Sequence, residues 1–234
     1  MSSIKKISKA LADVLCECPL FRSLSENQIL EYLAHSKSKL YGYEKGEFIF
    51  DMETAPANLL ILIRGKVDVG KIFLDGRRSV ITRFEKPGEI FGEVLLFLNK
   101  DSYEHFGEAV AYTEVLMVPK EFVLSGSGIN GEIHQKLTAN MISILAQKAF
   151  FLNSRVRLLL CSSLRAKIAH LLINETNCNP EKALVISRED LAELLGAARP
   201  SVSRELMKMH DDGLIKVDGK NIFGIDFEAL TDLL

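Results

Sequence analysis

The pattern of the chain changes once, near residue 128, and no other feature constrains its fold as strongly. Before this point short apolar runs alternate with glycine-containing turns, whereas the stretch from Glu132 to Lys167 contains neither glycine nor proline. Short strands at near-regular spacing are typical of a β sandwich or barrel, and a long uninterrupted stretch is typical of a helix. We therefore predict an α+β fold with a break at Ser125-Gly126-Ser127-Gly128.

Seven runs in the first half have the length and composition of strands. Asp75-Gly76 lies between two of them, which is a good hairpin signal. The arrangement predicts an N-terminal jelly roll. Its expected strands are Lys39–Tyr43, Phe48–Phe50, Leu59–Arg64, Val67–Phe73, Ser79–Phe84, Ala109–Ala111 and Glu114–Val118.

Composition excludes several classes of protein. Hydrophobic residues make up 47% of the 234 residues, which is too many for a disordered chain. No apolar run reaches the ~20 residues that a bilayer requires, and no signal-peptide core lies near the start, so we expect a cytoplasmic protein without a membrane partner. Four cysteines are too few for a disulfide framework. The histidines are scattered and no P-loop or nucleophile motif occurs, so we expect neither an enzyme nor a metal site.

The long helical stretch carries one apolar stripe. Its members recur at spacings of three, four and seven residues, as on one face of a helix. Such a stripe either packs on its own domain or pairs with a second copy, and we favour a homodimer. The expected dimer-interface residues are Ile133, Leu137, Met141, Ile144 and Phe151.

The last part of the chain has the local signals of a winged helix-turn-helix. After a hinge within Arg155–Leu164, Ser162 or Ser163 can cap a new helix. Two helices joined by a glycine-containing turn then precede a hairpin and a final short helix. The expected elements are a helix Arg188–Leu195 capped by Ser187 and ended by Gly196, a helix from Arg199 to about His210, strands Leu214–Val217 and Ile222–Ile225, and a helix Phe227–Leu233.

The second helix of this motif reads DNA through its N-terminal residues. Arg199 and Arg204 can each contact guanine, which is worth about 1–3 kcal/mol of discrimination. The alternative is a ligand-binding interaction module that uses the helical hairpin for protein contact. Residues 161–234 carry nine Lys/Arg against twelve Asp/Glu, so only a local positive surface would attract DNA. The expected DNA-binding residues are Ser187, Arg199, Ser201, Ser203, Arg204, Lys208, Lys216 and Lys220.

Two blocks of motifs now occur in order. The first is Pro87-Gly88-Glu89-Ile90-Phe91-Gly92-Glu93, and the second combines Ser187-Arg188-Glu189-Asp190-Leu191 with Arg199-Pro200-Ser201-Val202-Ser203-Arg204. With a long helix between them, the chain from about residue 15 to 227 resembles the CRP/FNR family of bacterial transcription regulators. The resemblance implies an effector-sensing jelly roll with an N-terminal helix (1–128), a dimerisation helix (129–160) and a winged helix-turn-helix DNA-binding domain (161–234).

One departure from the family concerns the effector. Members that bind cyclic AMP have an Arg-Ser pair about ten residues after Gly-Glu, and the Arg holds the phosphate. Here Gly92 and Glu93 are followed by Tyr103-Glu104, and a glutamate would repel a phosphodiester. We therefore expect a small-molecule or redox/gas signal other than cyclic AMP. The expected effector-pocket residues are Gly92, Glu93, Tyr103, His105, Phe106, Leu152 and Asn153.

A second departure concerns base reading. Pro200 stands where many members have a Glu that accepts a hydrogen bond from cytosine, so we expect relaxed readout there and a guanine contact from Arg204. The expected target is palindromic double-stranded DNA, with RNA polymerase as a further partner if the chain is an activator.

Two cofactors are known in the family that the chain resembles. Iron–sulfur members use a cluster of N-terminal cysteines, but Cys16 and Cys18 have no third cysteine before Cys161, and Cys178 follows later, so we expect no cluster. A haem-based gas sensor remains the alternative for the effector. Its axial ligand would come from His35, His105, His134, Met117 or Met141.

Overall fold

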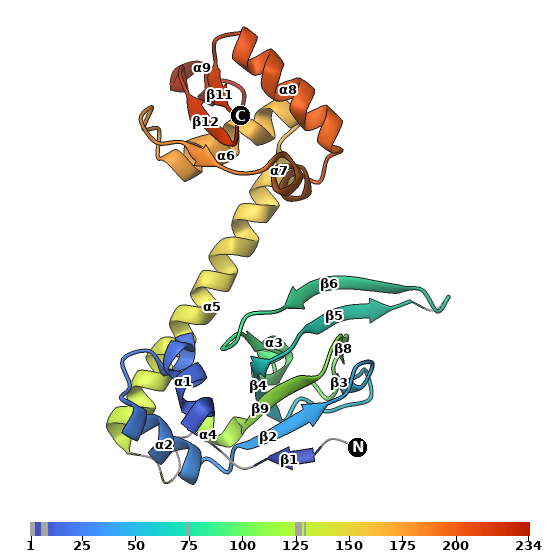
Figure 1. The fold of residues 1–234 in the computed structure, drawn as a ribbon, viewed down its shortest axis with the longest axis vertical. Helices are drawn as coiled ribbons and strands as arrows, with labels where there is room; N and C mark the ends of the chain where they lie inside the picture. Colours follow the sequence, from blue (N-terminus) through green and yellow to red (C-terminus); the bar gives the residue numbers. More distant parts are fainter. Residues whose placement is uncertain (1–2, 6–8, 74, 125–127, 129) are drawn as a thin grey trace. The chain divides into compact units, whose positions relative to one another are not determined.

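The structure is a computed structural model of the chain that describes all residues except 1–2, 6–8, 74, 125–127 and 129 (Figure 1). The chain divides into two compact units, Met1–Ala146 and Gln147–Leu234, with the division inside one helix. Residues 125–127 of the predicted break lie outside the described residues. The limits of the three functional domains stay predictions.

The N-terminal unit is built on two antiparallel sheets (Figure 1). One has the strand order β1-β2-β9-β4-β7 and the other β3-β8-β5-β6. The strands are β1 Ser3–Lys5, β2 Lys39–Tyr43, β3 Phe48–Phe50, β4 Asn58–Arg64, β5 Val67–Ile72, β6 Arg78–Phe84, β7 Ile90–Phe91, β8 Phe106–Ala109 and β9 Thr113–Pro119.

Strand β4 contributes side chains to two buried clusters, one on each face of its sheet. Successive side chains of a strand point to opposite faces. Leu59, Ile61 and Ile63 face one buried cluster, together with the helices, while Leu60 and Leu62 face the cluster between the two sheets. A strand buried on both faces reads as a continuous apolar run, which in β4 is Leu59–Ile63.

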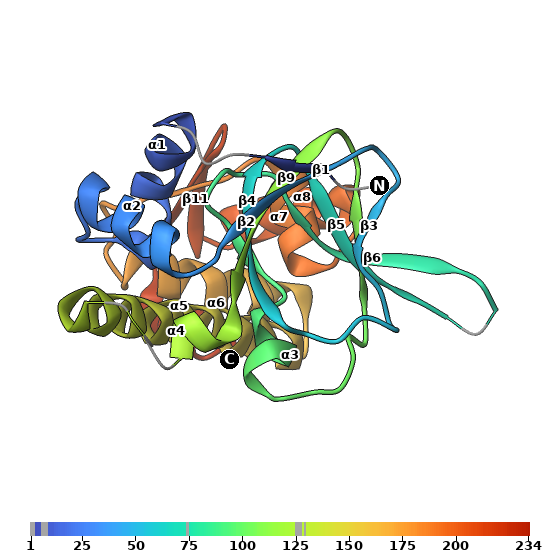
Figure 2. The same ribbon diagram turned by 90° about the horizontal axis from the view of Figure 1, so that it is seen from below.

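Helices cover the outer face of the first sheet. Figures 1 and 2 show α1 (Lys9–Glu17) and α2 (Glu26–His35) to one side of the strands. A reciprocal capping box between Ser25 and Gln28 starts α2. The unit also contains η1 Pro19–Phe21, α3 Glu93–Phe97, α4 Lys120–Leu124 and the first half of α5 Gly131–Leu160.

The stripe expected to form the dimer interface packs on its own unit instead. Ile133, Leu137, Met141 and Ile144 are at most 8% exposed and belong to the core cluster of the N-terminal unit. On the same helix, the Asn140 side chain donates to the backbone oxygens of Leu20 and Arg22. The assignment of these four residues to a dimer interface was wrong, because a spacing of three and four residues does not say which surface buries the stripe. Phe151, the fifth residue, is 57% exposed.

The C-terminal unit follows the predicted winged helix-turn-helix order. Ser163 caps α6, as one of the two predicted candidates. The elements are α6 Leu164–Thr176, β10 Leu184–Val185, α7 Arg188–Leu195, α8 Arg199–Asp211, β11 Ile215–Asp218, β12 Asn221–Gly224 and α9 Phe227–Thr231. The three strands form one sheet of order β10-β12-β11.

The strand predictions hold with one displacement. We expected a strand at Ala109–Ala111, whereas β8 spans Phe106–Ala109. The reason is a turn stabilised by Thr113, whose hydroxyl donates to the Ala111 carbonyl at 2.8 Å and so ends pairing before that residue. The short strands β1, β7 and β10 were not predicted.

Candidate DNA-binding surface and effector pocket

Helices α7 and α8 are fixed to each other by an apolar contact. Leu191 and Leu195 of α7 and Val202 and Leu206 of α8 are at most 1% exposed, and Leu194 is partly buried beside them. Gly196 ends α7 in the left-handed conformation at φ 60°, which suits a residue without a Cβ. The N-terminal turn of α8 therefore has a defined position on α7.

The predicted DNA-reading side chains lie on the exposed part of α8. Arg199, Arg204 and Lys208 are exposed, and Ser201 and Ser203 are half-buried. Pro200 lies in the first turn, where its missing N–H removes no helical hydrogen bond. Arg204 Nε donates to the Pro200 carbonyl at 3.4 Å, and its remaining N–H groups point to no partner among the described residues.

Arg199 carries an ion pair that the sequence analysis missed. Its Nε lies 3.0 Å from the Glu189 carboxylate of α7, and both side chains are 62% exposed. The pairing places a negative charge beside the main positive charge of the reading helix. No signal in the sequence distinguishes Glu189 from a solvated residue of the first helical turn.

Two further arginines hold the motif together. Arg188 Nη2 donates to the Gly219 carbonyl at 3.1 Å, which ties the start of α7 to the turn between β11 and β12. Arg165 of α6 binds Glu205 at 2.6 Å and Asp212 at 2.7 Å, and these partners raise the pKa of its guanidinium. Both arginines are positioning residues for α8 and the wing.

The wing carries the other predicted basic residues. Lys216 on β11 and Lys220 in the β11–β12 turn are exposed. Ser187 caps α7, because its Oγ accepts from the Asp190 N–H at 3.0 Å and donates to the Asp190 carboxylate at 2.6 Å. Ser187 is therefore already engaged locally, and its hydroxyl has little freedom to reach DNA.

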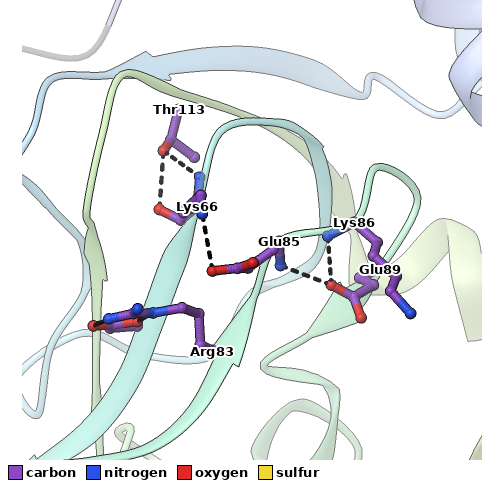
Figure 3. Close-up of polar contacts among 7 residues, drawn as sticks. Lys66, Arg83, Glu85, Lys86, Glu89 and Thr113 are labelled. Carbon is purple, nitrogen blue, oxygen red and sulfur yellow. Dashed lines mark hydrogen bonds and ion pairs between the residues drawn. The ribbon is translucent and has the colours of Figure 1, made fainter.

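The predicted effector segment begins at a constrained turn. Gly92 has φ 74°, and a Cβ there would lie 3.2 Å from the Tyr103 hydroxyl and from Leu60. Glu93 follows as the first residue of α3 and is 3% exposed. The loop before this turn is pinned by Glu89, whose carboxylate accepts from the backbone N–H groups of Glu85 and Lys86, while Lys66 pairs with Glu85 (Figure 3).

Tyr103 fills the space between the two sheets. Its ring stacks on Phe50 with centroids 4.1 Å apart, in a cluster that also contains Phe91. Burial, and secondarily the Glu93 carboxylate, raises the pKa of Tyr103 to about 12. Tyr103 is therefore a buried aromatic residue of the core between the sheets, and its assignment to an effector pocket stays a prediction.

The other predicted pocket residues are not all gathered with Tyr103. His105 is half-buried. Phe106 lines a cavity of about 390 Å³ that is also lined by Arg78 and Glu108, which pair with each other at 2.6 Å. Leu152 and Asn153 are exposed on the part of α5 that belongs to the C-terminal unit, so their role in an effector pocket stays a prediction.

The candidate cofactor ligands are dispersed. Among the residues that the structure describes, no three His, Cys, Asp or Glu side chains gather as a metal site. Burial raises the pKa of Cys18 to about 11, which disfavours the thiolate that an iron–sulfur cluster needs. None of the described helices is both long and apolar enough to cross a membrane.

Two family models match this chain, one over each unit. The Cyclic nucleotide-binding domain matches residues 42–125, and the Crp-like helix-turn-helix domain matches residues 166–233. The chain belongs to the CRP/FNR family. A CRP/FNR regulator is a DNA-binding transcription regulator and not an enzyme, so both of these predictions are confirmed.

Curated relatives match most of the chain, and a solved structure has the same fold. The chain is 25% identical to the CRP-like cAMP-activated global transcriptional regulator of Mycobacterium tuberculosis, covering 81% of this chain and 85% of that one. It is 26% identical to the Cyclic AMP receptor protein of Thermus thermophilus, covering 85% and 88%. The crystal structure of DNR from Pseudomonas aeruginosa has the same fold, with a TM-score of 0.52 and 20% identity over 98% of this chain and 100% of that one.

Proposed function

We propose that two copies of the chain bind one palindromic DNA site, each placing α8 in the major groove. One observation carries the proposal. Arg204 and Lys208 are exposed on the face of α8 opposite Val202, Leu206 and Met209, which are fully buried, and Arg199 is exposed as the first residue of the helix. A helix anchored on one face and cationic on the other is the part of a helix-turn-helix that enters the groove.

The side chains divide by what they reach. Arg199 and Arg204 can contact guanine edges in bidentate fashion, whereas serines and lysines contact phosphates and fix register. We assign the phosphate contacts to Ser201, Ser203, Lys208, Lys216 and Lys220. Ser187, at the start of α7, is a further candidate for a phosphate contact. Pro200 offers no acceptor to cytosine, so the base pair beside Arg199 is read weakly.

The second copy would use the exposed face of α5. Large apolar side chains on this helix are exposed in the single chain: Ile142, Phe150, Phe151, Leu152, Val156 and Leu160, at 52–77%. A palindromic site needs a twofold dimer, and exposed apolar surface of this extent marks an interaction site. We assign residues 129–160 to dimerisation, 1–128 to sensing and 161–234 to DNA binding.

We infer that the signal is not cyclic AMP, although two relatives are named for it. The stacked Tyr103 and Phe50 rings occupy the space between the sheets, and neither Tyr103 nor Glu104 offers a positive charge to a phosphate. A signal that displaces Tyr103 would act on the segment from Gly92 to Ala109 and shift the population of dimer arrangements. A DNA target places this work in the cytoplasm, and an activating role would add RNA polymerase as a partner.

The test is selection of genomic fragments by the purified full chain without added effector. Recovery of one palindromic motif supports the proposal, and cyclic AMP should leave its affinity unchanged. The matched variant is Arg204→Ala, which should lose the motif while remaining a folded dimer. A folded chain that enriches no motif, with or without haem, cyclic nucleotides and aromatic acids, would contradict the proposal.

A further inference from the structure

The C-terminal unit contains a cavity that the proposed function does not use. It measures about 450 Å³ and lies among the last turns of α5, α6 and the end of α7 (Figure 1). Ligand pockets commonly have volumes of about 300–1,000 Å³ and an apolar lining with a few polar groups. The apolar residues that line this cavity are Phe150, Phe151, Leu158, Leu171 and Leu194. Every lining residue belongs to the C-terminal unit.

Arg155 is a cation held in place at this cavity. Its Nη1 donates to the Leu194 carbonyl at 3.3 Å, and its Cζ lies 5.2 Å from the centroid of the Phe151 ring. The other N–H groups of Arg155 have no hydrogen-bond partner among the described residues. Because the side chain is half-buried and already ordered by two contacts, an anion that pairs with it would pay little for fixing it.

The charges around the cavity favour an anion. Arg155, Arg157 and Glu175 line it, so two positive charges stand against one negative charge. In the part of the chain that the structure describes, Glu175 forms no ion pair with either arginine. On α6, the Asn174 amide nitrogen lies 3.0 Å from His170 Nδ1, and both side chains line the cavity. The lining therefore combines cationic and polar groups with an apolar surface that suits a hydrocarbon.

We propose that this cavity binds a small monocarboxylic acid with an apolar body, whose carboxylate pairs with Arg155. Arginine can hold a carboxylate through two parallel N–H groups. Arg157 is exposed, and side chains two residues apart on a helix point to different sides, so Arg157 is not the partner. The inference goes beyond the proposed function, because this site lies in a different unit from the segment Gly92–Ala109.

Arg155 also connects the cavity to the DNA-reading motif. The Leu194 carbonyl that it binds belongs to the last turn of α7, and Lys167 of α6 donates to the adjacent Leu195 carbonyl at 3.3 Å. The last carbonyls of a helix have no partner within the helix, so these two cations supply the missing donors. A carboxylate on Arg155 would therefore lie beside the group that anchors α7, the helix on which α8 packs.

The experiment measures binding of hydrocinnamate to the full chain by isothermal titration calorimetry. The neutral hydrocinnamamide is the matched probe and should bind about tenfold more weakly, because hydrogen bonds between charged groups are the stronger ones. Arg155→Gln should weaken binding of the acid about tenfold and leave binding of the amide unchanged. The matched variant Arg157→Gln removes the same charge from an exposed position and should weaken the acid less than about threefold. Circular dichroism checks that each variant is folded.

Hydrogen exchange locates the bound acid. Saturating hydrocinnamate should slow amide exchange in residues 150–158 and 170–177, because a ligand that binds the folded cavity disfavours local opening. Asn174→Trp adds a bulky ring at an exposed residue of the lining and should remove both the binding and the protection. Protection of residues 92–109 in place of these two segments would overturn the site.

Other results would also overturn the inference. Equal affinities for the acid and the amide, or equal losses in Arg155→Gln and Arg157→Gln, would overturn the pairing with Arg155. Absence of binding at acid concentrations up to about 10 mM would overturn the site itself. These results leave the proposed DNA binding untouched, because selection of the palindrome tests it separately.

Discussion

The ring of Tyr103 lies on the ring of Phe50, with centroids 4.1 Å apart and an interplanar angle of 24°. The backbone N–H of Tyr103 donates to the Thr54 carbonyl at 3.0 Å, which holds the segment after α3 against the loop after β3. Both contacts hold Tyr103 within the buried cluster between the two sheets. This relationship gives the sensing unit a filled core between its sheets.

Removing the Tyr103 ring should destabilise the N-terminal unit. Tyr103→Ala leaves a cavity between the sheets, and aromatic-to-alanine changes in cores cost about 3–5 kcal/mol. Tyr103→Phe keeps the stacked ring and should cost about 1 kcal/mol or less. Urea denaturation followed by circular dichroism measures both. Equal urea midpoints for Tyr103→Ala and the wild type would show that packing of the Tyr103 ring does not stabilise the N-terminal unit.

Stability should fall in alkali. Burial raises the pKa of Tyr103 and of Tyr43 from 10 to about 12, and that of Cys18 from 9 to about 11. The folded state therefore favours the neutral groups, and their contribution is complete below pH 9 and is lost progressively between pH 9 and 12. The urea midpoint against pH should decline over this window, less steeply in Tyr103→Phe. A midpoint that stays flat to pH 12 would contradict these shifts.

The sequence predicted the helix-turn-helix more closely than the sensing pocket. Ser187, Gly196 and Pro200 act within their own turns, so their signals are local and the bounds of α7 follow from them. The stack of Tyr103 on Phe50 joins residues far apart in the chain, and no local pattern records it. The periodicity of α5 predicted its apolar stripe, but not which surface covers the stripe. The spacing of Ile133 and Leu137 is the same whether these side chains pack on their own unit or on a second copy.

Removing the charge of Glu189 should strengthen DNA binding. In the free chain Glu189 pairs with Arg199, and on DNA it would add a negative charge near the phosphates. Glu189→Gln should raise the affinity for DNA about threefold, because the exposed ion pair is weak and its loss leaves Arg199 available to DNA. The affinity should also depend more steeply on salt concentration, since Arg199 then adds a contact to the DNA. Fluorescence anisotropy at salt concentrations from about 50 to about 300 mM measures the DNA affinity and its dependence on salt.

The control for this change is Glu193→Gln, an exposed residue of the same helix. It removes the same charge away from Arg199 and should alter affinity less. If Glu189→Gln and Glu193→Gln behave alike, the ion pair has no specific role and only the net charge matters.

The Arg188 contact should hold the wing. Arg188→Gln removes the hydrogen bond to the Gly219 carbonyl, and a lost hydrogen bond of about 1 kcal/mol corresponds to about fivefold faster amide exchange in the β11–β12 turn. Lys220→Gln, which removes a wing charge but no clamp, should weaken DNA binding while leaving exchange unchanged. Faster exchange in both variants would assign the effect to charge.

The most direct test of the account is a double-mutant cycle between Arg204 and the guanine it reads. Arg204→Ala should weaken binding to the selected palindrome about tenfold to hundredfold, and replacing the contacted guanine should do the same in the wild type. The account predicts that the two changes together cost no more than either alone, because they remove one contact. Fully additive losses would show that α8 does not read that base through Arg204.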